Sequence, residues 1–191
     1  IEFKCDSYMS SSFHTIRSVS FCGSGYDVYN FLVLPRACTN MPILSADIVV
    51  LPGGTLAAID FQPSCDINHE SNRGSFSFNR DEYYNCGLYD KLASISTSYQ
   101  NTLPSGGDLP DHAKDYFSPH ALWTKFENTD EDSFDATLNA VTDYVQMYVD
   151  TFTTSTSTSE IKYTTTAKER RLFQRKYLQY RIDKDPAKNL L

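Results

Sequence analysis

The chain has 191 residues, of which 40% are hydrophobic and 21% are charged, and its formal net charge is −7 at pH 7. This length and composition predict a single globular domain over residues 1–191 with one buried core. The negative charge argues against general nucleic-acid binding, and no apolar run approaches the ~20 residues of a membrane-spanning helix.

The cysteines and histidines show no metal-binding spacing. The five cysteines include no C-x-x-C pair, so we expect neither a zinc site nor an iron–sulfur cluster. Free thiols in a reducing compartment are the simplest interpretation of their odd number. The residues concerned are Cys5, Cys22, Cys38, Cys65 and Cys86, with His14, His69, His112 and His120.

The first half of the chain has the pattern of a β-meander. Four β-rich or apolar segments alternate with glycine or proline turn signals, which is typical of antiparallel hairpins. The segments are residues 16–21, 26–34, 43–51 and 55–61. The pair Gly53-Gly54 invites comparison with phosphate loops, but G-x-G-x-x-G and G-K-[ST] are both absent, which favours a hairpin turn.

The second half changes from loops to helices. Residues 64–85 and 103–111 predict loops, and residues 116–126 are a further strand candidate. Residues 151–159 predict a polar linker and residues 167–181 a last helix. Apolar side chains three or four apart predict an earlier helix with one apolar face, formed by Phe134, Leu138, Val141, Val145 and Tyr148. Strands followed by helices indicate an antiparallel sheet covered by helices.

The last helix runs into a carboxylate. Proline at 186 disfavours helix in the residue before it, so we expect the helix to end at Asp185. Asp185 lies four residues after Arg181, which suits a site where a guanidinium holds an acidic ligand and a carboxyl supplies protons. The alternative is an ordinary i,i+4 pair on a solvated helix end, and such pairs are common.

Two carboxylates interrupt apolar strands. Asp47 lies within ILSADIVV and Asp60 within LAAIDF. Burying an ionised carboxylate is costly unless it is paired, and a carboxyl kept protonated near neutrality can donate a proton. The alternative is that either side chain points to solvent from an alternating sheet. Asn30 is a similar polar break in its strand.

Taken together, these segments resemble the ferredoxin-dependent bilin reductases. The matching segments are Asn30, Leu34 to Arg36, Met41 to Val49, Ala58 to Pro63, Tyr116 to Trp123, Tyr177 to Arg181 and Asp185 to Lys188. The first four resemble the central sheet of that family, and the fifth resembles its F-S-P-x-x-L-F strand. The last two resemble its substrate-contacting helix and loop.

The resemblance implies an α/β fold, a three-layer α/β/α sandwich with a central antiparallel sheet. An open-chain tetrapyrrole would lie between the sheet and the C-terminal helices, with no tightly bound cofactor and with reduced ferredoxin as electron donor. Asp47 and Asp185 match the catalytic, proton-donating carboxyls. Asn30, Arg181 and Ser118 match substrate-binding positions, and the bidentate geometry of Arg181 suits a propionate.

Within the family, the ending and the F-S-P strand most resemble the branch that reduces the A-ring diene. Aspartate at 47 favours 15,16-dihydrobiliverdin as substrate and phycoerythrobilin as product. The pair of Asn30 and Asp47 also resembles enzymes that reduce biliverdin at the 15,16-methine bridge, and reduction to phytochromobilin is a further alternative. A bilin carrier or chaperone is the alternative from another class, although a pure carrier needs no buried proton donors.

Ferredoxins are typically acidic, so an acidic chain needs a basic patch to dock one. The dense basic cluster is on the last helix, and we expect some of its members to flank the pocket mouth and others to face the core. The cluster is Lys168, Arg170, Arg171, Arg175 and Lys176. We also expect a monomer that binds no membrane, in the plastid stroma of a eukaryote or the cytoplasm of a cyanobacterium.

Overall fold

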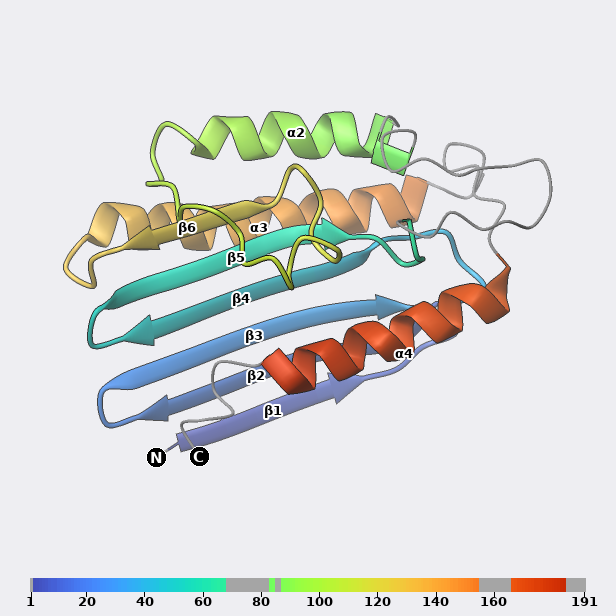
Figure 1. Cartoon of the computed structure of the whole chain (residues 1–191), viewed down its shortest axis with the longest axis horizontal. Helices are drawn as coiled ribbons and strands as arrows, with labels where there is room; N and C mark the ends of the chain where they lie inside the picture. Colours follow the sequence, from blue (N-terminus) through green and yellow to red (C-terminus); the bar gives the residue numbers. More distant parts are fainter. Residues whose placement is uncertain (1, 68–82, 85–86, 155–165, 185–191) are drawn as a thin grey trace.

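The computed structural model describes residues 2–67, 83–84, 87–154 and 166–184 (Figure 1). A six-stranded antiparallel sheet holds the strands in chain order, from β1 to β6. The strands are β1 (Glu2–Tyr8), β2 (Phe13–Gly23), β3 (Tyr26–Pro35), β4 (Ile43–Leu51), β5 (Gly54–Gln62) and β6 (Leu122–Phe126). The helices are α2 (Gly87–Tyr99), α3 (Glu131–Thr154) and α4 (Ala167–Lys184).

The helices cover opposite faces of the sheet (Figure 1). Alternate residues of a strand point to opposite faces, so β4 sends Leu44 to the cluster that includes α2 and α3 and Ile43 to the cluster that includes α4. These two hydrophobic clusters make two helix layers with the sheet between them. The predicted three-layer α/β/α sandwich is therefore confirmed.

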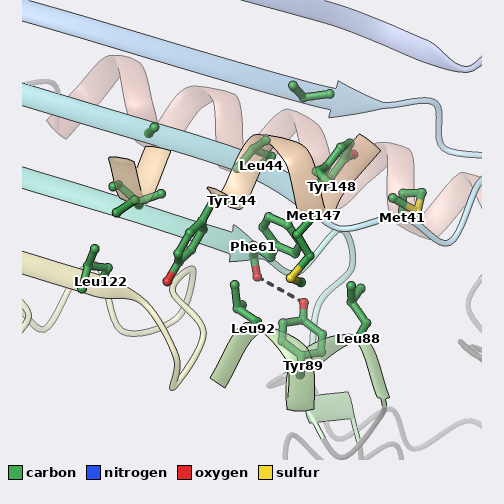
Figure 2. Packing of buried hydrophobic residues seen from close by; sticks show 14 of the residues in the cluster. Met41, Leu44, Phe61, Leu88, Tyr89, Leu92, Leu122, Tyr144, Met147 and Tyr148 are labelled. Atoms are coloured by element: carbon green, nitrogen blue, oxygen red, sulfur yellow. Dashed lines mark hydrogen bonds between the residues drawn. The ribbon is translucent and has the colours of Figure 1, made fainter. Parts of the chain in front are cut away.

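The larger core lies between the sheet, α2 and α3 and is rich in aromatic side chains (Figure 2). The ring of Phe61 packs edge-on against Tyr144 and Tyr148, with centroids 5.9 and 5.3 Å apart. The hydroxyl of Tyr89 donates a hydrogen bond to the carbonyl of Phe61 at 3.1 Å. Many of the aromatic residues therefore serve packing on this face.

All four predicted hairpin segments form strands; Gly53 lies in the turn between β4 and β5, and Gly54 is the first residue of β5. Gly54 has a φ of +127°, and a Cβ there would lie 2.7 Å from the carbonyl oxygen of Phe126. The turn geometry and this close approach require glycine. The hairpin interpretation is thus confirmed for Gly53-Gly54.

Other predictions need correction. The strand predicted over residues 116–126 is limited to Leu122–Phe126, because a turn occupies the residues before it. α3 continues through residues 151–154, where the sequence predicts a linker, and the rest of that predicted linker, residues 155–159, lies outside the described residues. Its buried face is also rotated from the predicted stripe: Leu138 is 45% exposed, whereas Ala140 and Tyr144 are fully buried. Among the helices that the structure describes, none has the length and hydrophobicity that a membrane crossing requires.

Candidate active site

A cavity lies on the α4 side of the sheet, enclosed by β3 to β6, by α4 and by the segment from Leu109 to Phe117. Apolar and aromatic side chains form most of its wall. Its polar and charged lining is Asn30, Asp47, Gln62, His112, Trp123, Tyr180, Arg181 and Lys184. A limited number of polar groups in a mostly apolar cavity is typical of a site that binds an organic ligand.

The floor of the cavity is one row of residues across the sheet. Asn30 on β3 pairs with Asp47 on β4, which pairs with Ala58 on β5, and Ala58 pairs with Trp123 on β6. This register lets the Asn30 amide donate a hydrogen bond to the Asp47 carboxylate. Arg17 on β2 donates in turn to the Asn30 amide oxygen at 3.4 Å. The sequence prediction that placed Asn30 and Asp47 in one site is consistent with this geometry.

The positive charge beside Asp47 is the guanidinium of Arg181, on helix α4. Arg181 Nη2 lies 2.5 Å from Asp47 Oδ1, and Nη1 donates to Ser45 Oγ at 2.6 Å and to Tyr177 Oη at 3.0 Å. Tyr177 and Arg181 are one helical turn apart, so both reach the same part of the sheet. Burial opposes the charge on Arg181, but Asp47 and the Tyr177 hydroxyl outweigh it, and its pKa is raised.

Asp47 therefore points into the structure rather than to solvent. It accepts hydrogen bonds from Asn30 and Arg181, and from Ser45 Oγ at 3.1 Å. Asp47 must exchange its Arg181 partner before it can carry a proton to a ligand, so its role as proton donor stays a prediction.

Tyrosines complete the α4 side. Burial raises the pKa of Tyr177, and burial followed by the nearby Tyr177 raises the pKa of Tyr180 to about 12. Tyr180 stacks on Tyr116 with centroids 4.2 Å apart, and His112 lies 6.0 Å from the Tyr180 ring. Both phenols remain neutral near pH 7, so Tyr180 offers a hydroxyl group and ring surface to the cavity, and the Tyr177 hydroxyl accepts a hydrogen bond from Arg181 behind it.

Ser118 is not among the residues that line the cavity. It is 3% exposed, and its backbone N–H and hydroxyl donate to the Asp60 carboxylate at 2.7 and 2.5 Å. The fully buried Asp60 thus fixes the segment before β6 against β5. Contact between Ser118 and a substrate stays a prediction. Asp185 lies outside the described residues, directly after the last residue of α4.

The basic cluster of α4 divides into parts. Arg170 is 6% exposed and donates to the carbonyl of Ala37 at 2.7 Å, as expected for the members that face the core. Arg171 and Arg175 are exposed, but they line a second cleft with His14 and Arg36 and not the cavity that holds Asp47. That some members of the cluster flank the mouth of the candidate site stays a prediction.

Sequence analysis missed other members of the site. Lys184 lies one turn after Tyr180 on α4, and both line the cavity with Arg181. Tyr180 belongs to the segment matched to the substrate-contacting helix, whereas Lys184 does not. Gln62 and His112 carried no local signal. Among the described residues, no group of three or more His, Cys, Asp or Glu side chains is placed to hold a metal ion.

Comparisons with known proteins agree with this architecture. The phycoerythrobilin:ferredoxin oxidoreductase of Synechococcus sp. strain WH8020 is 30% identical over 172 residues, covering 88% of this chain and 60% of the relative. The protein of that name from Prochlorococcus marinus strain MIT 9211 is 32% identical over 176 residues, with the same coverage of both chains. The chain thus spans about 60% of the length of these curated relatives.

A crystal structure of phytochromobilin synthase from tomato in complex with biliverdin matches with a TM-score of 0.78. The match covers 99% of this chain and 62% of that one at 23% identity, which shows the shared fold. The family model described as ferredoxin-dependent bilin reductase matches residues 2–191. Because that match includes nearly every residue, the chain belongs to the ferredoxin-dependent bilin reductases.

Proposed function

We propose that this chain reduces the A-ring diene of 15,16-dihydrobiliverdin to phycoerythrobilin with electrons from ferredoxin. The observation that carries the proposal is the Asp47–Arg181 pair on the floor of a largely apolar cavity. A carboxyl for proton transfer and a guanidinium for a propionate are what this chemistry needs. The names of the relatives, which specify phycoerythrobilin, support the choice of product.

In the proposed reaction, the apolar walls bind the conjugated rings, and Arg181 and Lys184 bind propionate groups. A propionate that takes over the guanidinium of Arg181 releases Asp47 from its ion pair, which makes this carboxyl available for proton transfer to the pigment. Reduction of the diene consumes two electrons, delivered singly by ferredoxin, and two protons. Asp47 and Asp185 deliver these protons to the substrate.

Ferredoxin docks, in this proposal, at the second cleft, where Arg171 and Arg175 lie one helical turn apart beside Arg36 and His14. Within the described part of the chain, no ion pair involves any of these three arginines. An acidic partner would therefore meet uncompensated positive charge on a chain that is acidic overall.

An anaerobic assay with reduced ferredoxin tests the proposal. 15,16-Dihydrobiliverdin and biliverdin are supplied separately, and the products are identified by absorbance and chromatography. Phycoerythrobilin formed from 15,16-dihydrobiliverdin supports the proposal. Turnover of biliverdin alone replaces it with the second candidate, reduction of biliverdin, which the hydrogen-bonded Asn30–Asp47 pair favours. Pigment binding without reduction of either bilin would indicate a carrier.

The cellular location follows from the same proposal. A chain that draws electrons from ferredoxin would work in the plastid stroma of a eukaryote or in the cytoplasm of a cyanobacterium. We propose that it works there as a monomer, with no tightly bound cofactor.

A further inference from the structure

Gln62 is an exception among the buried polar residues of the α4 face. It is the last residue of β5, is 1% exposed and lines the cavity that holds Asp47. Its side-chain oxygen Oε1 is buried and has no hydrogen-bond partner among the residues that the structure describes. A buried acceptor without a donor destabilises a fold, so an apolar side chain of similar size would suit stability better.

Three other buried polar residues, Gln174, Ser45 and Asp60, make hydrogen bonds within the protein. Gln174 on α4 is also buried, and its Nε2 donates to the carbonyl of Pro35 at 3.0 Å. Ser45 and Asp60 take part in the hydrogen bonds described above. Trp123 Nε1 is buried without a partner as well, but a Cβ on Gly106 would lie 2.6 Å from it, so this N–H packs against the Gly106 backbone. Among the residues that line this cavity, Gln62 Oε1 is the buried acceptor without a partner in the described part of the chain.

We propose that Gln62 is a substrate-binding residue whose amide oxygen accepts a hydrogen bond from a pyrrole or lactam N–H of the bound tetrapyrrole. The inference rests on the proposed function, since it names a contact within the same cavity. A ligand N–H would give Gln62 Oε1 a hydrogen-bond donor only in the complex. This explains why glutamine occupies a position where an apolar residue would stabilise the free protein better.

The position of Gln62 gives it a role in choosing which ring reacts. Asp47 pairs with Ala58, whereas Gln62 pairs with Ile43, four residues further along β5. At about 3.3 Å per residue, this separates the two positions by roughly 13 Å along the strand. A linear tetrapyrrole carries N–H groups on several rings, so one bound at Gln62 presents a distant ring to Asp47. Gln62 would thus determine which ring of the pigment lies beside Asp47.

The test compares two substitutions to methionine, which is close to glutamine in size and has no amide. Gln62→Met removes the proposed ligand contact, and Gln174→Met removes a hydrogen bond that the protein makes with itself. Biliverdin is the probe: its affinity is measured by absorbance titration, and thermal unfolding is followed without pigment. Gln62→Glu, which keeps an acceptor oxygen, is the conservative variant.

The proposal predicts that Gln62→Met weakens biliverdin binding about tenfold and leaves the melting temperature unchanged or raised. Gln62→Glu should retain more affinity than Gln62→Met. Gln174→Met should lower the melting temperature by a few degrees and leave the affinity unchanged. Wild-type affinity in Gln62→Met would overturn the assignment, whatever its stability. Failure of the wild-type protein to bind either biliverdin or 15,16-dihydrobiliverdin would instead count against the proposed function itself.

Discussion

Arg181 on α4 and Asp47 on β4 form an ion pair with an N–O distance of 2.5 Å, although 134 residues separate them in the sequence. The two side chains are 16% and 28% exposed, so solvent screens the pair only in part. The contact fixes the end of α4 over the cavity floor. It therefore connects the stability of the fold to the geometry of the candidate site.

Loss of Arg181 should destabilise the protein. Arg181→Gln leaves the Asp47 carboxylate without its cation, and we expect the free energy of unfolding to fall by about 2–4 kcal/mol in urea titrations. Adding Asp47→Asn should recover part of this loss, because no unpaired charge then remains. The exposed pair of Lys114 and Asp111 provides a control, since Lys114→Gln should leave stability almost unchanged. Equal losses in both single variants would contradict a structural role for the Arg181 pair.

Stability should also fall at high pH because of the buried phenols. The pKa of Tyr180 is raised from about 10 to about 12, so the folded state keeps a proton that the unfolded state loses first. This contribution is complete below pH 10 and is lost as the pH rises toward 12. Tyr180→Phe should therefore reduce the slope of stability against pH between 10 and 12, as measured by urea unfolding. An identical slope in both proteins would show that Tyr180 titrates normally.

Binding of ferredoxin should depend on the arginines of the second cleft. Arg171→Glu with Arg175→Glu should raise the ferredoxin concentration needed for half-maximal rate about tenfold at low salt and flatten its salt dependence. Biliverdin affinity should not change, because neither arginine lines the cavity. Lys4→Glu with Lys91→Glu changes the net charge equally on exposed positions of β1 and α2. If both double variants weaken ferredoxin equally, net charge and not the cleft controls docking.

Asp185 should matter for turnover more than for binding. If it donates a proton, Asp185→Asn should bind the bilin normally and reduce it ~10²-fold more slowly. Single-turnover kinetics with bound 15,16-dihydrobiliverdin would measure this. A rate equal to wild type would show that Asp185 does not donate a proton. It would favour the alternative of an ordinary i,i+4 pair with Arg181.

Local patterns predicted the sheet well because hairpins are local. Alternating or apolar runs between glycine and proline turns located β2 to β5 to within a few residues. Such patterns do not predict β1, because its residues are mostly exposed and give the strand no buried face. Pairing with β2 is what forms this strand. Local patterns also do not predict α2, which contains serine and threonine at positions where better helix formers would reveal the pattern.

The site was harder to predict because its contacts are long-range. The sequence placed Asn30, Asp47 and Arg181 in one site only through a family resemblance, and it did not predict that Arg181 would pair with Asp47 itself. Ser118 could not be assigned to Asp60 from its F-S-P segment, since the bond spans 58 residues. The buried face of α3 was misplaced because alanine and tyrosine pack against the sheet where larger aliphatic residues were expected.

Asp47 is the residue on which the proposed reaction depends, so its replacement is the most direct test. Asp47→Asn keeps the size of the side chain but removes the group that would carry a proton. With bound 15,16-dihydrobiliverdin and reduced ferredoxin under anaerobic conditions, we expect the variant to bind the pigment and accumulate a bilin radical or a different product. Phycoerythrobilin formation should fall ~10²-fold or more. Formation of phycoerythrobilin at the wild-type rate by Asp47→Asn would contradict the role of Asp47 as proton donor.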